Sequence, residues 1–408
     1  MLRHEPFLEE AARRGASHPL GQDPLVGYLS LHAVDHAIQF GPESIPARHV
    51  AEKVLTEVLL LPDEALCKKP YFWVLDTIRR GRSWETITVR LTQLADALER
   101  DGRYNEAEDV FHTLAEIYEL PGVAAACGDV SVVTTLLGCA RTLRKQAEFD
   151  GAETWYGKAR EAAHAAGLHD EEVSARVGQA RLTIERGNYP KAQKILDGVH
   201  RDFVGAPLSP HARGSILHEM AGATRYTDRP HSVRLLWEAF ETYDDALDRE
   251  WALNDIANEL LEMAQFGPAR KALEVLEAHG SSEVVEFARR RLIEIAWHTG
   301  DRVLFHRIWG KIERELPSMR PAVRAEATLY AGNARRTFGD EEEGRQLLEE
   351  GRDLASAYGL NEIFIRSEEF LLAAPKETVP PVQGTDGTIQ VVTEGVDSLW
   401  RTGSLVRV

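Results

Sequence analysis

Apolar residues recur along this chain at steps of three or four, with polar residues between them. The spacing is clear at Leu91, Leu94 and Leu98, and again at Leu273 and Leu276. Side chains three or four positions apart share one face of an α-helix, so the pattern predicts amphipathic helices that each bury one stripe. Gly residues interrupt the pattern at intervals, and because Gly tolerates a positive φ at a helix end, they indicate turns between helices.

A longer pattern repeats on top of the helical one. Each copy begins with a small residue, and a turn with Gly or an aromatic residue follows seven to nine positions later. Twelve positions after the small residue comes an Ala or Gly. A larger apolar residue usually stands four positions beyond that one. The first copy is Ala95, Gly102, Tyr104, Ala107 and Phe111. Further copies begin at Ala140, Ala180, Ala257 and Gly332, and weaker ones run through Ser232 and Ala296.

The period of this pattern predicts paired helices. The second helix of each pair is anchored at Ala107, Ala152, Ala192, Ser232, Ala269, Ile308 and Gly344, at steps of 45, 40, 40, 37, 39 and 36 residues. A period near 40 in a helix-forming sequence is typical of helix hairpins. Small residues let the two helices approach where they cross, and a large residue such as Phe111 fills the space to the next pair. Each pair leaves one apolar face open and therefore needs a stacked neighbour.

The pattern resembles the tetratricopeptide repeat (TPR) family over about residues 85–373. The copies at 95–111 and 140–159 carry the resemblance most specifically, because they hold the small residue, the turn aromatic, the Ala and the following aromatic at the family's spacing. The steps exceed the family's usual period of about 34 residues, which indicates longer helices, as in bacterial regulatory variants of the fold. The resemblance implies an all-α, right-handed superhelix (α-solenoid) of stacked antiparallel helix hairpins.

We expect four segments in the chain. They are an N-terminal extension at 1–24, helical capping hairpins at 25–84, the repeat array at 85–373, and a linker with a C-terminal tail at 374–408. The capping region lacks a basic recognition helix, which argues against a helix-turn-helix. After Ala373 the composition changes to one rich in Pro and Gly, typical of a linker. The sequence that follows could form short strands or pair with a partner's edge, and the alternative is a mobile tail.

Composition and charge narrow the class of protein. Lys and Arg total 48 and Asp and Glu total 65, and the resulting net charge of −17 disfavours nucleic acid as a partner. Three Cys are too few for a disulfide framework. The charged N-terminus does not resemble a secretory signal and no apolar run is long enough for membrane insertion, so we expect a cytoplasmic protein. The excess of Arg over Lys suggests a bacterial source with a GC-rich genome.

A search for catalytic motifs finds none of the common ones. The sequence has no Gly-rich phosphate loop, no Gly-x-Ser-x-Gly elbow and no His-Glu-x-x-His zinc motif. His211 and His218 are seven positions apart and could share a helix face, but a metal site there is disfavoured. We therefore expect no enzymatic activity, no cofactor and no metal.

The resemblance points to one candidate site. In tetratricopeptide proteins the first helix of each pair lines a concave groove, at positions near the small mid-helix residue. Asn254 and Asn258 lie four positions apart there, where paired amides can grip a peptide backbone, and the basic residues could receive carboxylates. The alternative is that these are ordinary solvated helix residues. The predicted groove residues are Arg141, Arg144, Lys145, Arg181, Asn254, Asn258, Asn333 and Arg336.

Three hypotheses for function follow. The first is a non-enzymatic scaffold whose groove holds an extended peptide or a partner protein's segment, with a preference for acidic character. The second is a signal-sensing regulator that changes shape when it binds a peptide. The third is an enzyme with a site in the groove, which the absence of a catalytic constellation disfavours. The sequence gives no indication of the oligomeric state.

Overall fold

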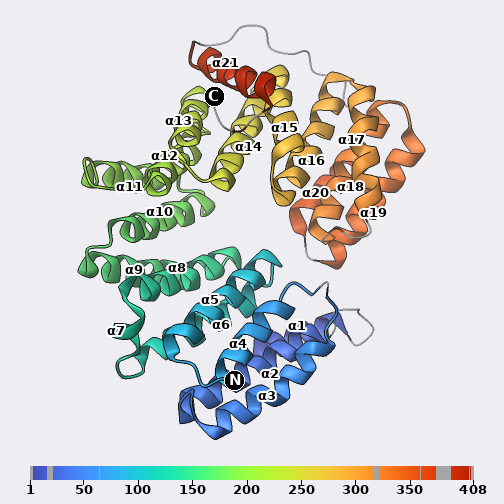
Figure 1. Cartoon of the computed structure of the whole chain (residues 1–408). Helices are drawn as coiled ribbons and strands as arrows, with labels where there is room; N and C mark the ends of the chain where they lie inside the picture. Colours follow the sequence, from blue (N-terminus) through green and yellow to red (C-terminus); the bar gives the residue numbers. More distant parts are fainter. Residues whose placement is uncertain are drawn as a thin grey trace. The chain divides into compact units, whose positions relative to one another are not determined.

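In the computed structural model of this protein, the secondary-structure elements of the described residues are α-helices, and no strand occurs among these residues (Figure 1). The described residues are 3–15, 22–63, 65–316, 319, 321–358, 360–373, 387–403 and 405. They form two compact units, which we call unit 1 (Met1–Pro207) and unit 2 (Leu208–Val408).

Unit 1 holds the first eleven helices. Their bounds are α1 (Glu5–Arg14), α2 (Asp23–Phe40), α3 (Ile45–Leu60), α4 (Lys68–Arg79), α5 (Trp84–Arg100), α6 (Tyr104–Glu119), α7 (Val123–Cys127), α8 (Asp129–Lys145), α9 (Phe149–Ala166), α10 (His169–Glu185) and α11 (Tyr189–Asp202).

Unit 2 holds the remaining helices. Their bounds are α12 (Pro210–Thr224), α13 (Arg229–Thr242), α14 (Ala246–Glu262), α15 (Phe266–His279), α16 (Ser282–Thr299), α17 (Arg302–Glu315), α18 (Pro321–Thr337), α19 (Glu341–Ala357), α20 (Asn361–Leu372) and α21 (Gly387–Thr402).

The predicted helix pairs are present in both units. The pairs are α5/α6, α8/α9, α10/α11, α12/α13, α14/α15, α16/α17 and α18/α19, and the two members of each pack together. Each predicted second-helix anchor, from Ala107 to Gly344, lies in the second helix of its pair. Small residues stand where the helices cross, as with Ala95 and Ala107, which are both fully buried. The all-α fold of stacked, TPR-type hairpins is therefore confirmed.

The closest crossing is made by glycines in α18 and α19. A Cβ atom on Gly332 would lie 2.7 Å from the Gly344 carbonyl oxygen, and one on Gly344 would lie 2.6 Å from the Gly332 carbonyl oxygen. A Cβ on Gly351 would meet Thr328 at 2.7 Å. Since residues later in α19 contact residues earlier in α18, the two helices run antiparallel, as predicted.

Aromatic residues connect one pair to the next. A Cβ at Gly138 in α8 would lie 2.4 Å from the ring of Phe111 in α6, and one at Gly178 in α10 would lie 2.2 Å from the ring of Tyr156 in α9. Each ring therefore occupies a notch that only Gly leaves open. This confirms that Phe111 fills the space between neighbouring pairs.

The N-terminal extension folds as a helix that the sequence analysis did not predict. Helix α1 packs on α2 and α6 and buries Phe7 completely. His4, at the start of α1, contacts Asp109 in α6 at 2.6 Å and Asp35 in α2 at 3.1 Å. Burial opposes the charge on the His4 ring, but hydrogen bonds and attraction from the two carboxylates outweigh it and raise its pKa to about 9.

Arg103 lies at the centre of a second buried charge network in unit 1. It is 6% exposed and pairs with Asp23 of α2 and with Glu106 of α6. It also donates to the Tyr71 hydroxyl at 3.4 Å. These contacts tie α2, α4 and α6 together through charged and polar groups rather than through apolar side chains alone.

The C-terminal segment was expected to be a mobile tail or short strands, and both expectations are wrong for the part that the structure describes. Residues Gly387–Thr402 form α21, which packs on α13 and α15. The buried apolar side chains of α21 include Ile389, Val392, Val396 and Leu399. The expected linker at residues 374–386 lies outside the described residues.

A glycine notch and polar contacts fix the position of α21. A Cβ at Gly395 would lie 2.2 Å from the Trp237 ring of α13, so the ring rests against the helix backbone. Lys271 of α15 pairs with Asp397 at 2.7 Å, and the Trp400 indole donates to Glu274 at 3.0 Å. No helix in the described part of the chain is long and apolar enough to cross a membrane.

Candidate functional site

The eight predicted groove residues all lie on first helices of the pairs. Arg141, Arg144 and Lys145 are on α8 and Arg181 is on α10, which places four residues in unit 1. Asn254 and Asn258 are on α14, and Asn333 and Arg336 are on α18, which places the other four in unit 2. The prediction therefore divides into a basic set in unit 1 and a mainly amide set in unit 2.

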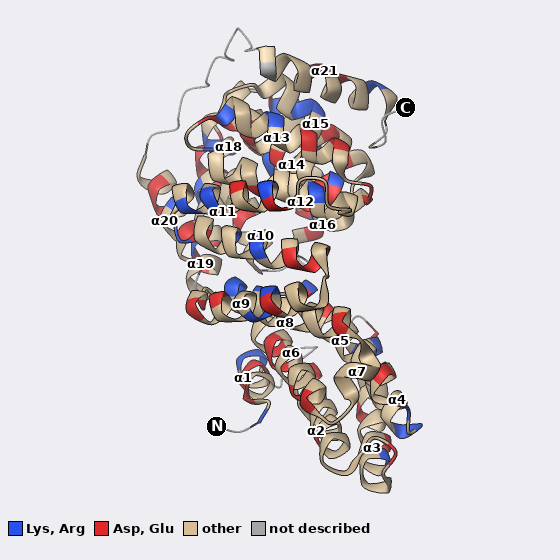
Figure 2. Cartoon of the chain, turned by 90° about the vertical axis from the view of Figure 1, so that its left-hand side faces the viewer, with Lys and Arg blue, Asp and Glu red and all other residues tan. Residues whose placement is uncertain are grey.

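Two of the basic residues in unit 1 form ion pairs with the neighbouring helix pairs. The Nε of Arg141 donates to Glu99 of α5 at 2.9 Å, and Arg144 pairs with Glu185 of α10. Arg144 is buried. Figure 2 shows basic and acidic residues lying along the same helices in both units. Because their charges are matched internally, Arg141 and Arg144 stabilise the stacking of α5, α8 and α10.

Lys145 differs from its two neighbours on α8. Partial desolvation lowers the pKa of Lys145, and the charges of Arg144 and Arg181 lower it further. The charges of Glu185 and Glu99 act in the opposite direction and offset part of this effect.

In unit 2, Asn254 and Asn258 present acceptors from one face of α14. Asn254 is 3% exposed, and its Nδ2 donates to Asp255 at 3.2 Å, which fixes the orientation of the amide. The Oδ1 of Asn254 and the Oδ1 of Asn258 are both buried and have no hydrogen-bond partner among the residues that the structure describes. A buried polar group of this kind costs stability until something binds to it.

Asn333 of α18 presents a donor. It is 3% exposed, and its Nδ2 has no hydrogen-bond partner in the described part of the chain. We call the Oδ1 atoms of Asn254 and Asn258 and the Nδ2 of Asn333 the unsatisfied amide atoms. Together they offer two acceptors and one donor from first helices of a single unit.

Arg336 has a different role from the one that the sequence suggested for it. It is buried and pairs with Glu341 at 2.8 Å. It also donates to the Phe370 carbonyl and, at 2.9 Å, to the Ala373 carbonyl. Those carbonyls belong to the C-terminal end of α20, where helical partners are absent. Arg336 therefore caps α20, and we leave it out of the proposed site.

The helices next to the amides are cross-linked through Tyr330 of α18. Arg291 of α16 donates to the Tyr330 hydroxyl at 3.0 Å and to Glu294 at 2.6 Å. Arg366 of α20 donates to the same hydroxyl at 3.3 Å. Burial raises the pKa of Tyr330, so the hydroxyl stays protonated. These contacts hold α16, α18 and α20 in register beside the unsatisfied amide atoms.

The two His residues that the sequence singled out lie on α12 and pair with α14. His211 contacts Asp248 at 2.6 Å, and His218 contacts Asp255 at 3.0 Å. Each His has its own carboxylate one helix pair away, and they do not share a site. Within the described residues no cluster of three or more metal-ligating side chains occurs.

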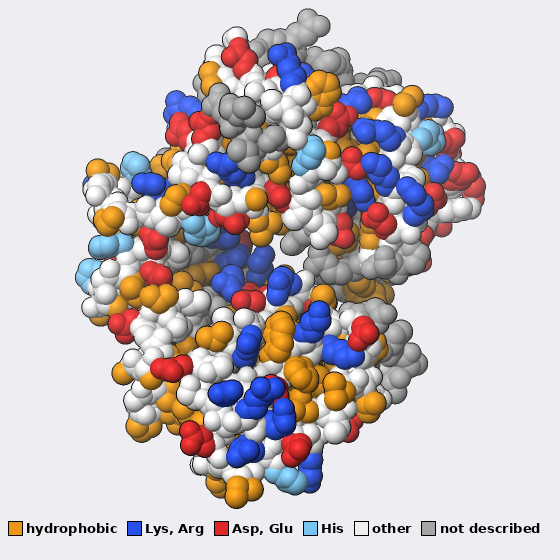
Figure 3. All heavy atoms as spheres, viewed as in Figure 1, with side chains coloured by type: hydrophobic (Ala, Val, Ile, Leu, Met, Phe, Trp, Pro, Cys, Tyr) orange, Lys and Arg blue, Asp and Glu red, His pale blue; other side chains and the backbone are white. Residues whose placement is uncertain are grey.

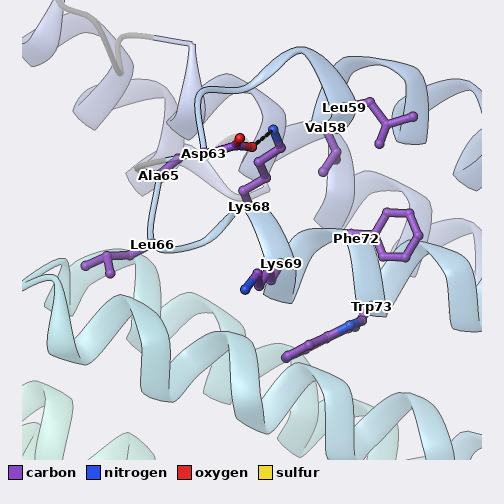
Figure 4. Close-up of a pocket in the computed structure, with 9 residues that line it drawn as sticks. All are labelled: Val58, Leu59, Asp63, Ala65, Leu66, Lys68, Lys69, Phe72 and Trp73. Atoms are coloured by element: carbon purple, nitrogen blue, oxygen red, sulfur yellow. Dashed lines mark hydrogen bonds and ion pairs between the residues drawn. The ribbon is translucent and has the colours of Figure 1, made fainter.

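Unit 1 also has a pocket, between α3, α4 and the loop that joins them, which was not predicted from the sequence (Figure 4). Phe72 and Trp73 of α4 contribute to it and are 36% and 40% exposed. A signal was present in the run Tyr71–Leu75, which is apolar at every position. Such a run covers all sides of a helix, so some of its side chains must point away from the core.

Neither a family model nor a curated protein matches the sequence. The structure is similar to a Rap protein complexed with competence and sporulation factor, with 9% identity, coverage of 93% of this chain and 99% of that one, and a TM-score of 0.46. The apo form of the quorum sensor NprR from B. thuringiensis matches with 10% identity, 86% and 97% coverage and a TM-score of 0.45. The Rap conjugation gene regulator of plasmid pLS20, in complex with the Phr* peptide, matches with 11% identity, 94% and 98% coverage and a TM-score of 0.44. At these values the likeness carries no statement about what this chain binds.

Proposed function

We propose that this protein is a non-enzymatic binding module whose unit 2 holds an extended peptide segment against the first helices α14, α16 and α18. The observation that carries the proposal is the set of unsatisfied amide atoms on Asn254, Asn258 and Asn333. Each buried polar atom left without a partner costs about 1–3 kcal/mol. A ligand that satisfies all three atoms recovers that free energy on binding.

An extended peptide backbone suits this arrangement because it alternates donors and acceptors. Backbone N–H groups can donate to the Oδ1 atoms of Asn254 and Asn258, and a backbone carbonyl can accept from the Nδ2 of Asn333. Helix α16 lies between α14 and α18 and packs on both. At about 10 Å between neighbouring helices the span is about 20 Å, which about six extended residues cover.

The preference for acidic partners rests on unit 2 in this proposal rather than on the four basic residues of unit 1. Arg141 and Arg144 are already paired with Glu99 and Glu185. Arg366 of α20, by contrast, donates to the Tyr330 hydroxyl and forms no ion pair with a carboxylate among the described side chains. An acidic residue at the α20 end of the peptide would supply that carboxylate.

The test is a selection of peptide binders followed by measured affinities. Dodecapeptides from a random displayed library are selected on the wild-type protein, and the selected peptides are titrated against Asn254→Ala/Asn258→Ala. We expect the affinity to fall about tenfold or more, because two hydrogen bonds to the backbone are lost. Scattering with and without the peptide then separates a rigid scaffold from a regulator that changes shape.

The matched control is Gln346→Ala, an exposed amide on the second helix α19. It should leave the affinity unchanged. The proposal fails if every selected peptide binds the double Asn variant as tightly as the wild-type protein, or if the control weakens binding as much as that variant does.

A further inference from the structure

The pocket in unit 1 has the size and lining of a binding surface. Its volume is about 820 Å³, within the range of pockets that hold a small ligand or several side chains. It is formed by the end of α3, the joining loop and the first half of α4. Its lining residues are Val58, Leu59, Asp63, Ala65, Leu66, Lys68, Lys69, Phe72 and Trp73 (Figure 4).

Large apolar side chains stand exposed around this pocket. Leu59 and Leu66 are each more than 60% exposed, and Phe72 and Trp73 are more than a third exposed. The core face of α4 is supplied by other residues, including Tyr71 and fully buried partners along the helix. Phe72 and Trp73 therefore form a second apolar face that the described residues leave open. Clustered exposed aromatics of this kind are typical of protein interfaces.

The segment that carries the pocket is rich in basic residues. Over residues 68–82 the acidic residue is Asp76 and the basic ones are Lys68, Lys69, Arg79, Arg80 and Arg82, in a chain whose net charge is −17. Arg79 and Arg80 both pair with Asp76, whereas Lys68 and Lys69 line the pocket. On the side of unit 1 turned to the viewer, Figure 3 shows basic and hydrophobic side chains interspersed.

Two of the nearby cations lack a carboxylate. Lys69 is exposed and forms no ion pair with any described residue. The Arg90 guanidinium lies 5.3 Å from the centre of the Trp73 ring and donates to the Gln93 amide oxygen at 2.8 Å, and no described carboxylate pairs with it. Lys68, in contrast, is already paired with Asp63 at 2.8 Å. Lys69 and Arg90 are thus the charges available to a partner.

We propose that this pocket docks an acidic protein segment that carries a large apolar side chain. The apolar side chain enters the hollow between Leu59, Leu66 and the Phe72–Trp73 face. Carboxylates on either side of it pair with Lys69 and with Arg90, whose guanidinium already rests on Trp73. A protein segment is favoured over a nucleic acid because Leu59 and Leu66 are aliphatic, and bases would leave them without matching apolar groups. The surface lies wholly within unit 1 and does not depend on the amide site of unit 2.

The experiment uses the full chain carrying Asn254→Ala/Asn258→Ala, so that unit 2 does not contribute the binders. Random dodecapeptides are selected on this protein and counted by sequencing. We expect enrichment of sequences with Asp or Glu beside Trp, Phe or Leu. Their affinity should fall more than tenfold in Trp73→Ala and about tenfold in Lys69→Glu/Arg90→Glu.

The charge control is Lys191→Glu/Lys194→Glu on α11, which makes the same change in net charge at exposed positions of unit 1. It should leave the affinity within twofold. Circular dichroism confirms that each variant stays folded. The proposal is overturned if no acidic sequences are enriched, or if the enriched peptides bind the Trp73 and Lys69/Arg90 variants as tightly as the parent.

A single-stranded thymidine oligonucleotide serves as the second probe at physiological ionic strength. We expect no binding that depends on Lys69 and Arg90. Binding that the Lys69→Glu/Arg90→Glu variant removes would show that the partner class is nucleic acid and would overturn the proposal.

Discussion

The two units differ in the buried polar side chains that stand out in each. Unit 1 pairs charged groups with one another, as with His4 between Asp35 and Asp109, and Arg103 between Asp23 and Glu106. Unit 2 fixes its terminal helix α21 mainly with apolar residues and leaves the unsatisfied amide atoms on its first helices. The difference teaches that the charged groups of unit 1 mostly hold the fold, while the amides of unit 2 are the groups that we propose bind a ligand.

The largest effect is expected where the charge network of unit 1 is broken. Arg103→Met leaves Asp23 and Glu106 buried without their cation, and breaking such a pair costs about 3–5 kcal/mol. The free energy of unfolding by denaturant should fall by that amount. Arg100→Met, at an exposed position at the end of α5, should change it by less than about 0.5 kcal/mol. Equal losses in both variants would show that the network does not stabilise unit 1.

The docking of α1 should weaken as pH rises. The pKa of His4 is 6.5 when unperturbed and about 9 in the folded protein. Folding therefore favours the protonated ring, and its contribution is fully present below pH 6.5 and lost as pH rises through about 9. The rise in pKa corresponds to on the order of 3 kcal/mol. The check is the free energy of unfolding measured across this window.

His4→Gln is the control for that measurement, because it removes the titrating ring while other groups still titrate. The difference in unfolding free energy between wild type and His4→Gln should shrink steadily across the window. A constant difference would contradict the assignment of the pH dependence to His4.

In unit 2, a pair of glycine substitutions should distinguish the effect of α21 docking on stability from the effect of helix propensity. Gly395→Ala places a Cβ against the Trp237 ring, and we expect a loss of about 1–3 kcal/mol from overpacking. Gly310→Ala in α17 meets no atom within 4 Å, so we expect a gain of about 0.5–1 kcal/mol. Thermal unfolding measures the stability of both variants, and hydrogen exchange of α21 shows whether that helix stays docked. Two changes of the same sign would mean that the Trp237 contact does not hold the helix.

The smallest effect concerns the amides themselves. Asn258→Ala removes an unsatisfied acceptor and improves helix propensity, so we expect the free protein to become more stable by about 1 kcal/mol. The same substitution should weaken peptide binding. A residue whose removal raises stability and lowers affinity is one retained for binding. A loss of stability in Asn258→Ala would instead assign Asn258 to the fold.

The repeat was predictable from the sequence because it depends on the size of the residues within each copy. Ala95 and Ala107 must be small wherever two helices cross, and the tight turn between them lies within the same copy. The helix α21 was not predictable in this way. Its Val residues and Gly395 favour other conformations, and contacts with Trp237 from a distant helix override that preference.

The candidate site was only partly predictable, for a related reason. Sequence reasoning placed all eight residues on first helices, but it did not show which would already be paired. The separations do carry that information: Arg141 and Glu99 are 42 positions apart, and Arg144 and Glu185 are 41 apart. These sequence separations are close to the step of the repeat. An acidic residue that lies one repeat away from a basic residue, on the same helix face, therefore indicates an internal ion pair.

The position of α21 also has a consequence for synthesis on the ribosome. Lys271 and Asp397, which join α15 to α21, are 126 positions apart. At about 5–20 residues per second, α15 emerges about 6–25 s before the helix that covers it. During that interval Trp237 and its apolar surroundings lack their cover, whereas α1 of unit 1 emerges before the helices on which it packs. We therefore expect unit 2 to be more prone than unit 1 to aggregation during translation.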